Sequence, residues 1–484
     1  MKKLFSTFAI LTLLFACTDS FEDFNKEKKK PAKAPGESFF SNASKDLADI
    51  ISSTNVNNNV FKLYAQYWNE TTYIDETNYD LIKRNNANYM FLYYYREPLK
   101  DLKEAATIIA GTDYPLQDPE IKANKLYIIQ ILQSYAFQRL VDIFGAVPYT
   151  EALDIDNVYP AYDTGQDIYT DLIKKVKDAV DGLDEDFESF GSADLIYGGD
   201  VSLWKKFGNS LLVKLGITLA DYDPELAEAT ILAGVDGAFA SAGDDALFTY
   251  LTSSPNFNPL YLDIIASGRN DFVPANTIVN IMNDLEDPRR PAYFTLHTDG
   301  TYKGGAYGYK SSFSSHSHIP STISAPDFHG ILLTYSEIQF YLAEAASRGF
   351  ALPSPAEEYY NEAIRASFAF WGVDGADAYL DKPEVKYDAT QWEPLIATQA
   401  WIAFYTRGLE GWTSWRRFDL PVFNIAQTLA DRNEDESSIS TRFTFPINDQ
   451  TLNASNYQAI SKAIGGDLRT TRIFWDTHPV TDRR

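Results

Sequence analysis

The clearest structural signal in the sequence is IKANKLYIIQILQSYAFQRLVDIFGAVPY, residues 121–149. Its apolar residues recur at steps of three to five, which is typical of a helix with a buried face; they are Ile128, Leu132, Tyr135, Leu140 and Ile143. Gly145 and Pro148 follow directly, and both residue types favour the end of a helix. The segment therefore predicts a long helix that ends at Phe144.

Similar periodicity on both sides of this segment predicts a mainly α protein. Further helices are expected at 38–52, 58–72, 88–110, 165–182, 201–220, 224–233, 274–284, 332–348, 354–370 and 393–406. Short Gly, Pro or Asp breaks separate several neighbours, which favours antiparallel helix pairs. Pairs such as 332–348 with 354–370 have roughly the length of a tetratricopeptide repeat, although the sequence signature of that repeat is weak.

Two segments depart from this pattern, 240–330 and 430 to the C-terminus. In 240–330, Gly, Ser, Pro and Tyr become frequent and helical periodicity largely vanishes. A long irregular segment inside a compact domain is usually functional or disordered, and its aromatic residues argue against disorder. We therefore expect 38–484 to form a single helical domain, in which 240–330 is a loop-rich insertion on the ligand side.

The N-terminus has the features of a lipoprotein export signal. Lys2 and Lys3 precede a short apolar run, and Leu14-Phe15-Ala16-Cys17 follows the pattern cut by lipoprotein signal peptidase. The run is too short to span about 30 Å of hydrocarbon comfortably. We expect 1–16 to be the signal peptide, Cys17 to carry the lipid (palmitate), and 17–37 to be a flexible tether. The alternative is an ordinary secretory signal in which the only cysteine of the chain lies by chance.

The composition restricts the ligand class. The chain has 67 acidic and 42 basic residues and a formal charge of −25, which opposes binding to nucleic acid or anionic lipid by repulsion. Aromatic residues make up 14% of the chain, with 31 Tyr and 31 Phe. Tyrosine at this density suits partly solvated surfaces on which rings stack on sugars or contact peptides, because the ring is apolar and its edge is polar.

Several segments together resemble the SusD/RagB family of outer-membrane nutrient-binding lipoproteins. They are Gln138–Tyr149, Asp194–Ser210, Asp287–Arg289, Leu332–Ala345, Glu410–Leu420, Arg442–Pro446 with Asn453, and the run from Gln66 to Tyr79. Each motif is weak alone, but their order spans essentially the whole mature chain. The acidic residues after Cys17 also resemble the surface-export signal of Bacteroidetes lipoproteins, and a plain solvated linker is the alternative.

The resemblance implies a helical scaffold with four tetratricopeptide-like helix pairs, lipid-anchored at the outer membrane and exposed at the cell surface. It also implies capture of an oligosaccharide and its delivery to a TonB-dependent SusC-like barrel. A peptide receptor of the same family is the first alternative, a glycan hydrolase is the second and a purely structural lipoprotein is the third.

No convincing catalytic constellation is present, so we expect no enzyme activity. The chain lacks H-E-x-x-H and G-x-S-x-G, and its single cysteine is assigned to the lipid. Ser202 and Lys205 match S-x-x-K, but the partner motifs of β-lactamases are missing, and Ser202 is better explained near a helix start. With 67 acidic residues, paired carboxylates carry no glycosidase signal on their own.

We expect no metal or other cofactor, with one possible exception. His316 and His318 lie near Asp327 and His329 in sequence, but zinc needs three or four converging ligands, so polar loop roles are favoured. The run Asp431, Asn433 and Asp435 begins like a calcium loop, but Glu436 replaces the turn glycine. This rules out an EF-hand and leaves an irregular calcium site open.

Two aromatic groups are candidate ligand contacts. The first contains Trp68 and Tyr73, for which core packing between early helices is the alternative. The second lies on the glycine-rich segment 302–318, where glycines bury little apolar surface and the rings are expected to stay accessible. Its members are Tyr302, Tyr307, Tyr309, Phe313, His316 and His318. The family has no invariant ligand motif, so the resemblance assigns none of these residues.

Overall fold

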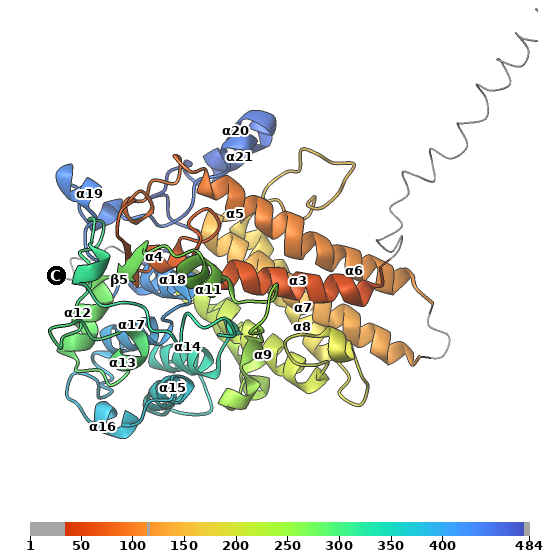
Figure 1. Cartoon of the computed structure of the whole chain (residues 1–484). Coiled ribbons are helices and arrows are strands. Elements are labelled where there is room, and N and C mark those ends of the chain that lie inside the picture. The colour runs from red at the N-terminus through yellow and green to blue at the C-terminus, as the bar shows by residue number, and fades with distance from the viewer. Residues whose placement is uncertain (1–33, 114–116, 479–484) are drawn as a thin grey trace, which may run out of the picture.

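The computed structural model describes residues 34–113 and 117–478, and helices dominate it (Figure 1). Four pairs of long helices pack side by side: α3 (Gly36–Ser52) with α6 (Lys100–Gly111), α7 (Pro119–Phe144) with α8 (Gly165–Gly182), α9 (Val201–Thr218) with α10 (Pro224–Gly234), and α14 (Tyr335–Ser347) with α15 (Ala356–Phe370). The prediction of a mainly α fold is confirmed. Within the described ranges, no helix is both long and apolar enough to cross a membrane.

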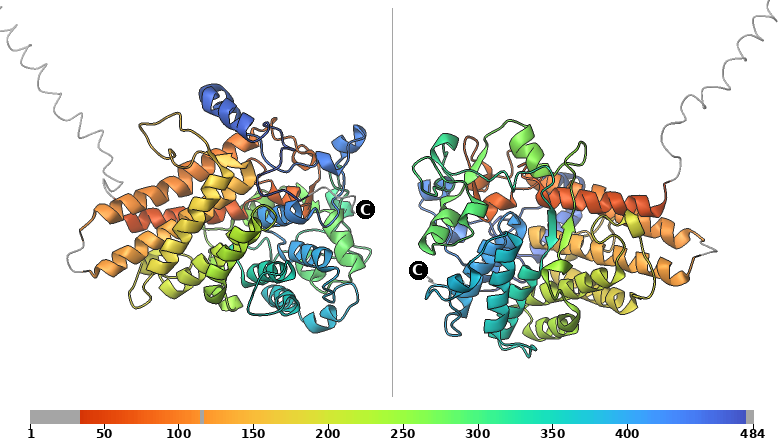
Figure 2. Two further views of the ribbon diagram at one scale, coloured as in Figure 1. Left: turned by 180° about the vertical axis from the view of Figure 1, so that it is seen from behind. Right: turned by 60° about the horizontal axis from the view of Figure 1, so that its bottom comes forward.

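The helix expected from 121–149 is α7, and it ends at Phe144 as predicted. Gly145 follows with φ of 81°, a left-handed conformation that glycine adopts without steric cost. Every residue from Ser134 to Phe144 is buried, so this half of α7 is covered on all sides. Figure 2 shows α7 within the bundle of long helices, with the later helices grouped at the opposite end.

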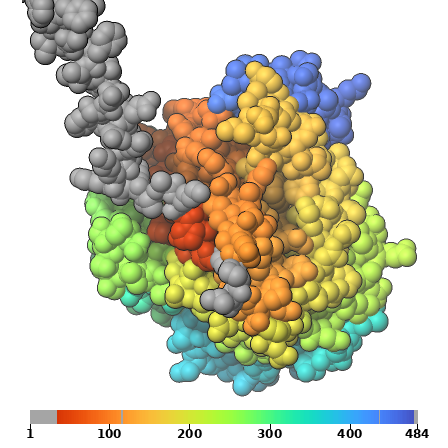
Figure 3. Space-filling model, turned by 90° about the vertical axis from the view of Figure 1, so that its right-hand side faces the viewer, coloured from red at the N-terminus to blue at the C-terminus, as the bar shows by residue number. Residues whose placement is uncertain are grey.

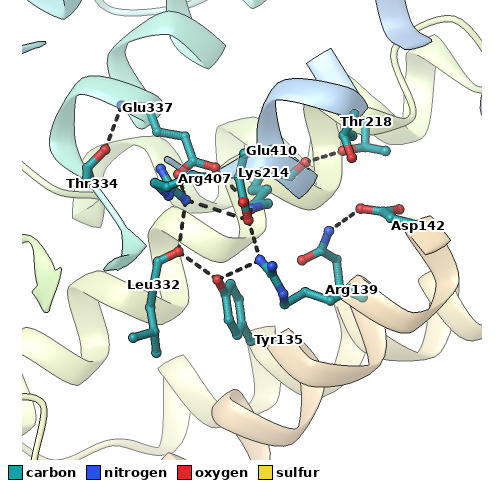
Figure 4. A network of polar contacts seen from close by, with 12 residues as sticks. Tyr135, Arg139, Asp142, Lys214, Thr218, Leu332, Thr334, Glu337, Arg407 and Glu410 are labelled. Atoms are coloured by element: carbon teal, nitrogen blue, oxygen red, sulfur yellow. Dashed lines mark hydrogen bonds and ion pairs between the residues drawn. The ribbon is translucent and has the colours of Figure 1, made fainter. Parts of the chain in front are cut away.

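A buried ion-pair network joins α7, α9, α14 and α18 (Gly408–Phe418) (Figure 4). Glu410 pairs with Arg139 and, at 3.4 Å, with Lys214. Glu337 forms ion pairs with Lys214 at 3.0 Å and with Arg407 at 2.5 Å. Although burial alone would raise it, the three cations hold the pKa of Glu410 well below its ordinary value. The network thus gives each buried charge an opposite partner.

The prediction of a helix at 58–72 is wrong over most of this range. Only α4 (Phe61–Tyr64) forms; Gln66 has a left-handed φ of 55°, and the chain continues as β1 (Trp68–Glu70). β1 pairs antiparallel with β5 (Phe272–Pro274), with Asn69 opposite Val273. Gln66 is fixed by this distant part of the chain, since its side-chain oxygen accepts from Thr277 at 2.6 Å.

The other expected helices agree more closely with the structure. The helix expected at 88–110 is divided into two in the structure, α5 (Asn86–Tyr94) and α6. A π-helical turn (Tyr95–Leu99) that contains Pro98 joins them. The one at 332–348 begins late, because β6 (Gly330–Leu333) precedes α14 and pairs with β4 (Ala246–Phe248). The segment 240–330 is rich in loops, and its helices are short. They are α11 (Pro259–Tyr261), α12 (Asn276–Asp284) and α13 (Arg290–Tyr293), with a π-helical turn at Leu262–Ala266.

The C-terminal part is more helical than predicted. It contains α20 (Ile447–Leu452) and α21 (Ala454–Ala463), which lie beside the loop around residues 150–160 (Figure 3). Asn453 and Asn456 donate to the carbonyl oxygens of Pro160 and Tyr159, at 2.8 and 3.0 Å. The remaining elements are β2 (Ala146–Val147), which pairs with β3 (Asp163–Thr164), α16 (Ala376–Leu380), α17 (Trp392–Ala403) and α19 (Gln427–Asp431).

Candidate functional site

Three adjoining pockets lie where α3 ends beside α11, β1 and β5. The acidic pocket has a volume of about 360 Å³, the central pocket about 310 Å³ and the outer pocket about 250 Å³. The acidic and central pockets share Leu262 and Asp263, and the central and outer pockets share Arg269 and Phe272. The three pockets are therefore neighbours on one face of the molecule, and together they are called the groove.

Tyr73 provides an accessible aromatic ring in the central pocket. Its side chain is 56% exposed, and the guanidinium of Arg84 lies 5.8 Å from the ring centre. Arg84 is itself held by Glu76, at 2.7 Å. The ring of Tyr73 is therefore solvent-accessible and lies beside polar groups. This arrangement suits stacking on a sugar or on a planar side chain.

Glu70 at the end of β1 lines the same pocket although it is only 3% exposed. Its carboxyl group accepts from the backbone N–H and the hydroxyl of Thr77, at 3.0 and 2.9 Å. Burial and the neighbouring carboxyl of Glu76 raise the pKa of Glu70 to about 9. The pair therefore retains a proton at neutral pH.

The acidic pocket combines apolar surface with carboxyl groups. Asp46, Asp49, Glu97 and Asp263 line it together with the ring of Tyr93. Burial, followed by the charges of Glu97 and Asp49, raises the pKa of Asp46 to about 7. These groups accept hydrogen bonds when ionised and donate when protonated, so the pocket can bind hydroxyl groups.

The outer pocket contains two of the residues predicted from the sequence, Phe313 and His318. Their rings are stacked, with centroids 3.8 Å apart and planes 10° from parallel. His318 Nε2 also lies 2.9 Å from the carbonyl oxygen of Phe313, which fixes the ring. With Tyr73, these are the three predicted residues that the structure brings to the groove.

Two candidate ligand contacts are core residues instead. Trp68 is 0% exposed and its indole N–H donates to the hydroxyl of Tyr405 at 2.9 Å. Tyr307, expected to be accessible among its glycines, is 2% exposed and its hydroxyl lies 3.4 Å from that of Tyr79. The prediction failed because Gly308 bonds to Asn69 of β1 at 2.9 Å, which folds this loop back onto the core.

Three further candidates reach the surface without lining the groove. Tyr302 is half-buried against Phe294, Tyr309 is 39% exposed, and His316 is half-buried with Nδ1 2.7 Å from the carbonyl oxygen of Ser312. A ligand role for these residues stays a prediction.

Cys17, the signal peptide and most of the tether lie outside the described residues. The expected tether boundary at 37 is one residue past the start of α3 at Gly36. In residues 34–113 and 117–478, no three His, Cys, Asp or Glu side chains converge as a metal-binding group. The calcium site at Asp431, Asn433 and Asp435 stays an open prediction.

Most of the polar groups of the groove were not predicted from the sequence, notably Glu70, Arg84, Asp263 and Arg269. They come from segments about 200 residues apart, joined by the pairing of β1 with β5. Each is an ordinary charged residue in its own segment, so no local pattern distinguished it.

Comparison with known proteins identifies the family. The model of the SusD-like family, described as starch-binding and associating with the outer membrane, matches residues 27–446. No curated protein matches the chain. A structure described as a chitin-binding protein has a TM-score of 0.79 at 23% identity, covering 92% of this chain and 100% of its own.

Two other solved structures are similar at the same level. A chitin-binding SusD homologue from Flavobacterium johnsoniae has a TM-score of 0.78 at 22% identity, covering 92% of this chain and 99% of its own. A SusD homologue from Bacteroides uniformis has a TM-score of 0.77 at 24% identity, covering 91% and 99%. At identities below 25% these likenesses show the fold alone.

Proposed function

The chain belongs to the SusD-like family of starch-binding, outer-membrane-associated proteins, and from this premise we propose that it captures an oligosaccharide in the groove. The observation that carries the proposal is the exposed ring of Tyr73, which lies beside buried and half-buried polar groups in the central pocket of the groove. Rings that stack on sugar faces, flanked by groups that bond hydroxyls, are the chemistry that a neutral glycan requires.

We further propose that the protein is lipid-anchored through Cys17, faces the cell exterior and acts without catalysis. It passes its ligand to a SusC-like TonB-dependent barrel, because it offers no spanning segment of its own within the described residues. Pull-down from outer membranes in mild detergent is expected to recover the barrel. Recovery of the protein alone would argue against this partnership.

The ligand class is tested by calorimetry on a soluble form that starts at Ala32, titrated with a panel of glycans and peptides. We expect a glycan to bind and to remain uncleaved. If a peptide binds and every glycan fails, the receptor is a peptide receptor of the same family. Release of shortened sugar by the pure protein would support a hydrolase and contradict the proposal.

The groove itself is tested by Tyr73→Ala. Loss of one stacking ring removes about 0.5–1.5 kcal/mol beyond area burial, which is roughly a 2- to 12-fold loss of affinity for the glycan found in the screen. Tyr159→Ala is the matched control, because this ring is also exposed, lies outside the groove and is not among the predicted ligand contacts. Equal affinities of Tyr73→Ala and the unaltered protein would place the ligand elsewhere.

A further inference from the structure

Three neighbouring segments carry exposed apolar side chains: α5, the loop 150–160 and α20. α20 packs against α5, and Figure 3 shows α20 and α21 beside the loop. We call their shared surface the apolar face. Its exposed apolar residues are Tyr89, Leu92, Ile155, Val158, Tyr159, Ile447 and Leu452. An exposed apolar surface built from several segments usually marks a site of interaction with a protein or a membrane.

The loop 150–160 is ordered although its apolar side chains face solvent. The carboxylate of Glu151 accepts from the side-chain amide of Asn157 at 3.0 Å and from the backbone N–H of Ala161 at 2.9 Å. Two asparagines at the start of α21 and within it hold carbonyl oxygens of the loop, as described above. Ile155 is nevertheless 91% exposed and Val158 is 70% exposed. Such a preorganised loop loses little conformational entropy on binding, so its apolar side chains suit the role of interface anchors.

Ring contacts beneath the surface fix the three segments relative to one another. The ring of Phe91 on α5 lies 6.4 Å from that of Tyr162, which follows the loop. The ring of Tyr162 in turn lies 5.0 Å from that of Phe445, which precedes α20. On α5, Tyr93 lines the acidic pocket of the groove. This helix therefore borders both the apolar face and the groove, so a partner on the face lies beside the bound ligand.

The charge of the apolar face restricts the partner. α5, the loop 150–160 and α20 contain no basic residue and four acidic ones, namely Glu151, Asp154, Asp156 and Asp449. From α6, Lys103 donates to the carbonyl oxygen of Leu153 at 2.7 Å and offsets one of these charges. A second copy of the chain would bring two acidic faces together, and an anionic lipid surface would repel the face as well. The face therefore fits a protein that has an apolar recess with a basic rim.

We propose that the apolar face is the surface on which the SusC-like barrel docks, with Ile155 and Leu452 entering an apolar recess of the barrel that has a basic rim. This inference rests on the partnership proposed above and adds the surface that forms it. The barrel then lies against α5, next to the acidic pocket, where it can receive the ligand directly from the groove.

The test measures how much barrel the tagged, full-length chain recovers from outer membranes in mild detergent. Ile155→Ser and Leu452→Ser are each expected to reduce recovery about tenfold, because a few anchor residues carry most of the binding energy of an interface. Leu232→Ser is the matched control, since it removes an exposed side chain from α10, and it is expected to recover the barrel fully. Unchanged recovery with both Ile155→Ser and Leu452→Ser would overturn the docking surface.

A charge reversal tests the basic rim. The backbone N–H of Asp156 donates to the carboxylate of Asp154 at 3.0 Å, and Asp186, after α8, makes the same contact with Asp184 at 3.1 Å. Both Asp156 and Asp186 are exposed, so the two positions are matched. Asp156→Lys is expected to lower barrel recovery severalfold, whereas Asp186→Lys leaves it unchanged. Equal or greater recovery with Asp156→Lys would overturn the charge assignment of the partner.

Calorimetry on the soluble form from Ala32 separates this inference from the proposed function. No residue of the apolar face lines the groove, so Ile155→Ser is expected to bind the glycan with unchanged affinity. Loss of glycan affinity together with the barrel would show that Ile155 is structural and overturn its role as an anchor. If the unaltered protein recovers no barrel, the partnership itself fails, and the docking surface with it.

The same soluble form tests the two other occupants of the face. Sedimentation velocity detects a second copy, and flotation with phosphatidylglycerol vesicles detects a lipid surface. We expect a monomer that does not float. A dimer that Ile155→Ser dissociates, or vesicle binding that this substitution abolishes, would overturn the proposal.

Discussion

Glu70 is a buried acid that faces both the groove and the core, and its titration is coupled to folding. Its pKa is about 9 in the folded chain against an ordinary 4.5, because burial and Glu76 disfavour the charge. Below pH 4.5 the folded and unfolded chains both hold the proton. As the pH rises from 4.5 to about 9, only the unfolded chain releases it, so stability falls by at most about 1.4 kcal/mol per pH unit for one proton.

We therefore predict that Glu70→Gln flattens the decline of stability between pH 5 and pH 9. Denaturant midpoints measured across this range provide the check. Glu104→Gln, at an exposed position on α6, is the control and is expected to follow the unaltered protein. Equal slopes for the protein and Glu70→Gln would show that Glu70 titrates normally.

Tyr307 and Tyr309 are two residues apart but have different environments. Tyr307→Ala removes a ring that packs between Tyr79 and the glycine-rich loop, so it is expected to cost about 3–5 kcal/mol of unfolding free energy. Tyr309→Ala removes an exposed ring and is expected to change stability by less than about 0.5 kcal/mol. Urea denaturation distinguishes them; similar midpoints for the two variants would contradict the burial of Tyr307.

At the scale of elements, α18 is fixed to α7 and α9 by the charges around Glu410. Glu410→Leu removes a buried carboxylate that pairs with both Arg139 and Lys214. We expect this loss to lower the free energy of unfolding by about 3–5 kcal/mol. Asp178→Asn on α8 breaks a pair with Lys174 in which both side chains are more than half exposed, and is expected to change the denaturation midpoint little. Comparable losses in the two variants would show that the buried network adds nothing beyond a surface pair.

Local patterns predicted the elements that local forces determine. The helices α7, α8 and α10 were predicted from apolar periodicity. In the structure, Thr164 and Asp223 cap the starts of α8 and α10, and such caps act within one turn. The failure at 58–72 has the opposite cause, because β1 exists only through its pairing with β5. The same limit applies to the groove: Tyr73, Phe313 and His318 were identified as aromatic candidates, whereas the charged residues beside them lacked any local signal.

At the scale of the whole molecule, attachment and folding are expected to be separable. The described fold begins with α3 at Gly36, after the predicted lipid site at Cys17. Cys17→Ala is therefore expected to move the protein from the membrane fraction to the soluble fraction without changing its melting temperature or circular dichroism. Retention of Cys17→Ala in washed membranes would contradict a lipid anchor at this residue.

The pairing of β1 with β5 also has a kinetic consequence. Asn69 must find Val273 across roughly 200 intervening residues, and closing so long a loop is entropically costly and slow. The helices between them have mainly local contacts and need not wait for this closure. The groove is therefore expected to be among the last parts to mature after export, so a newly secreted chain can hold most of its helices before it gains any affinity for its ligand.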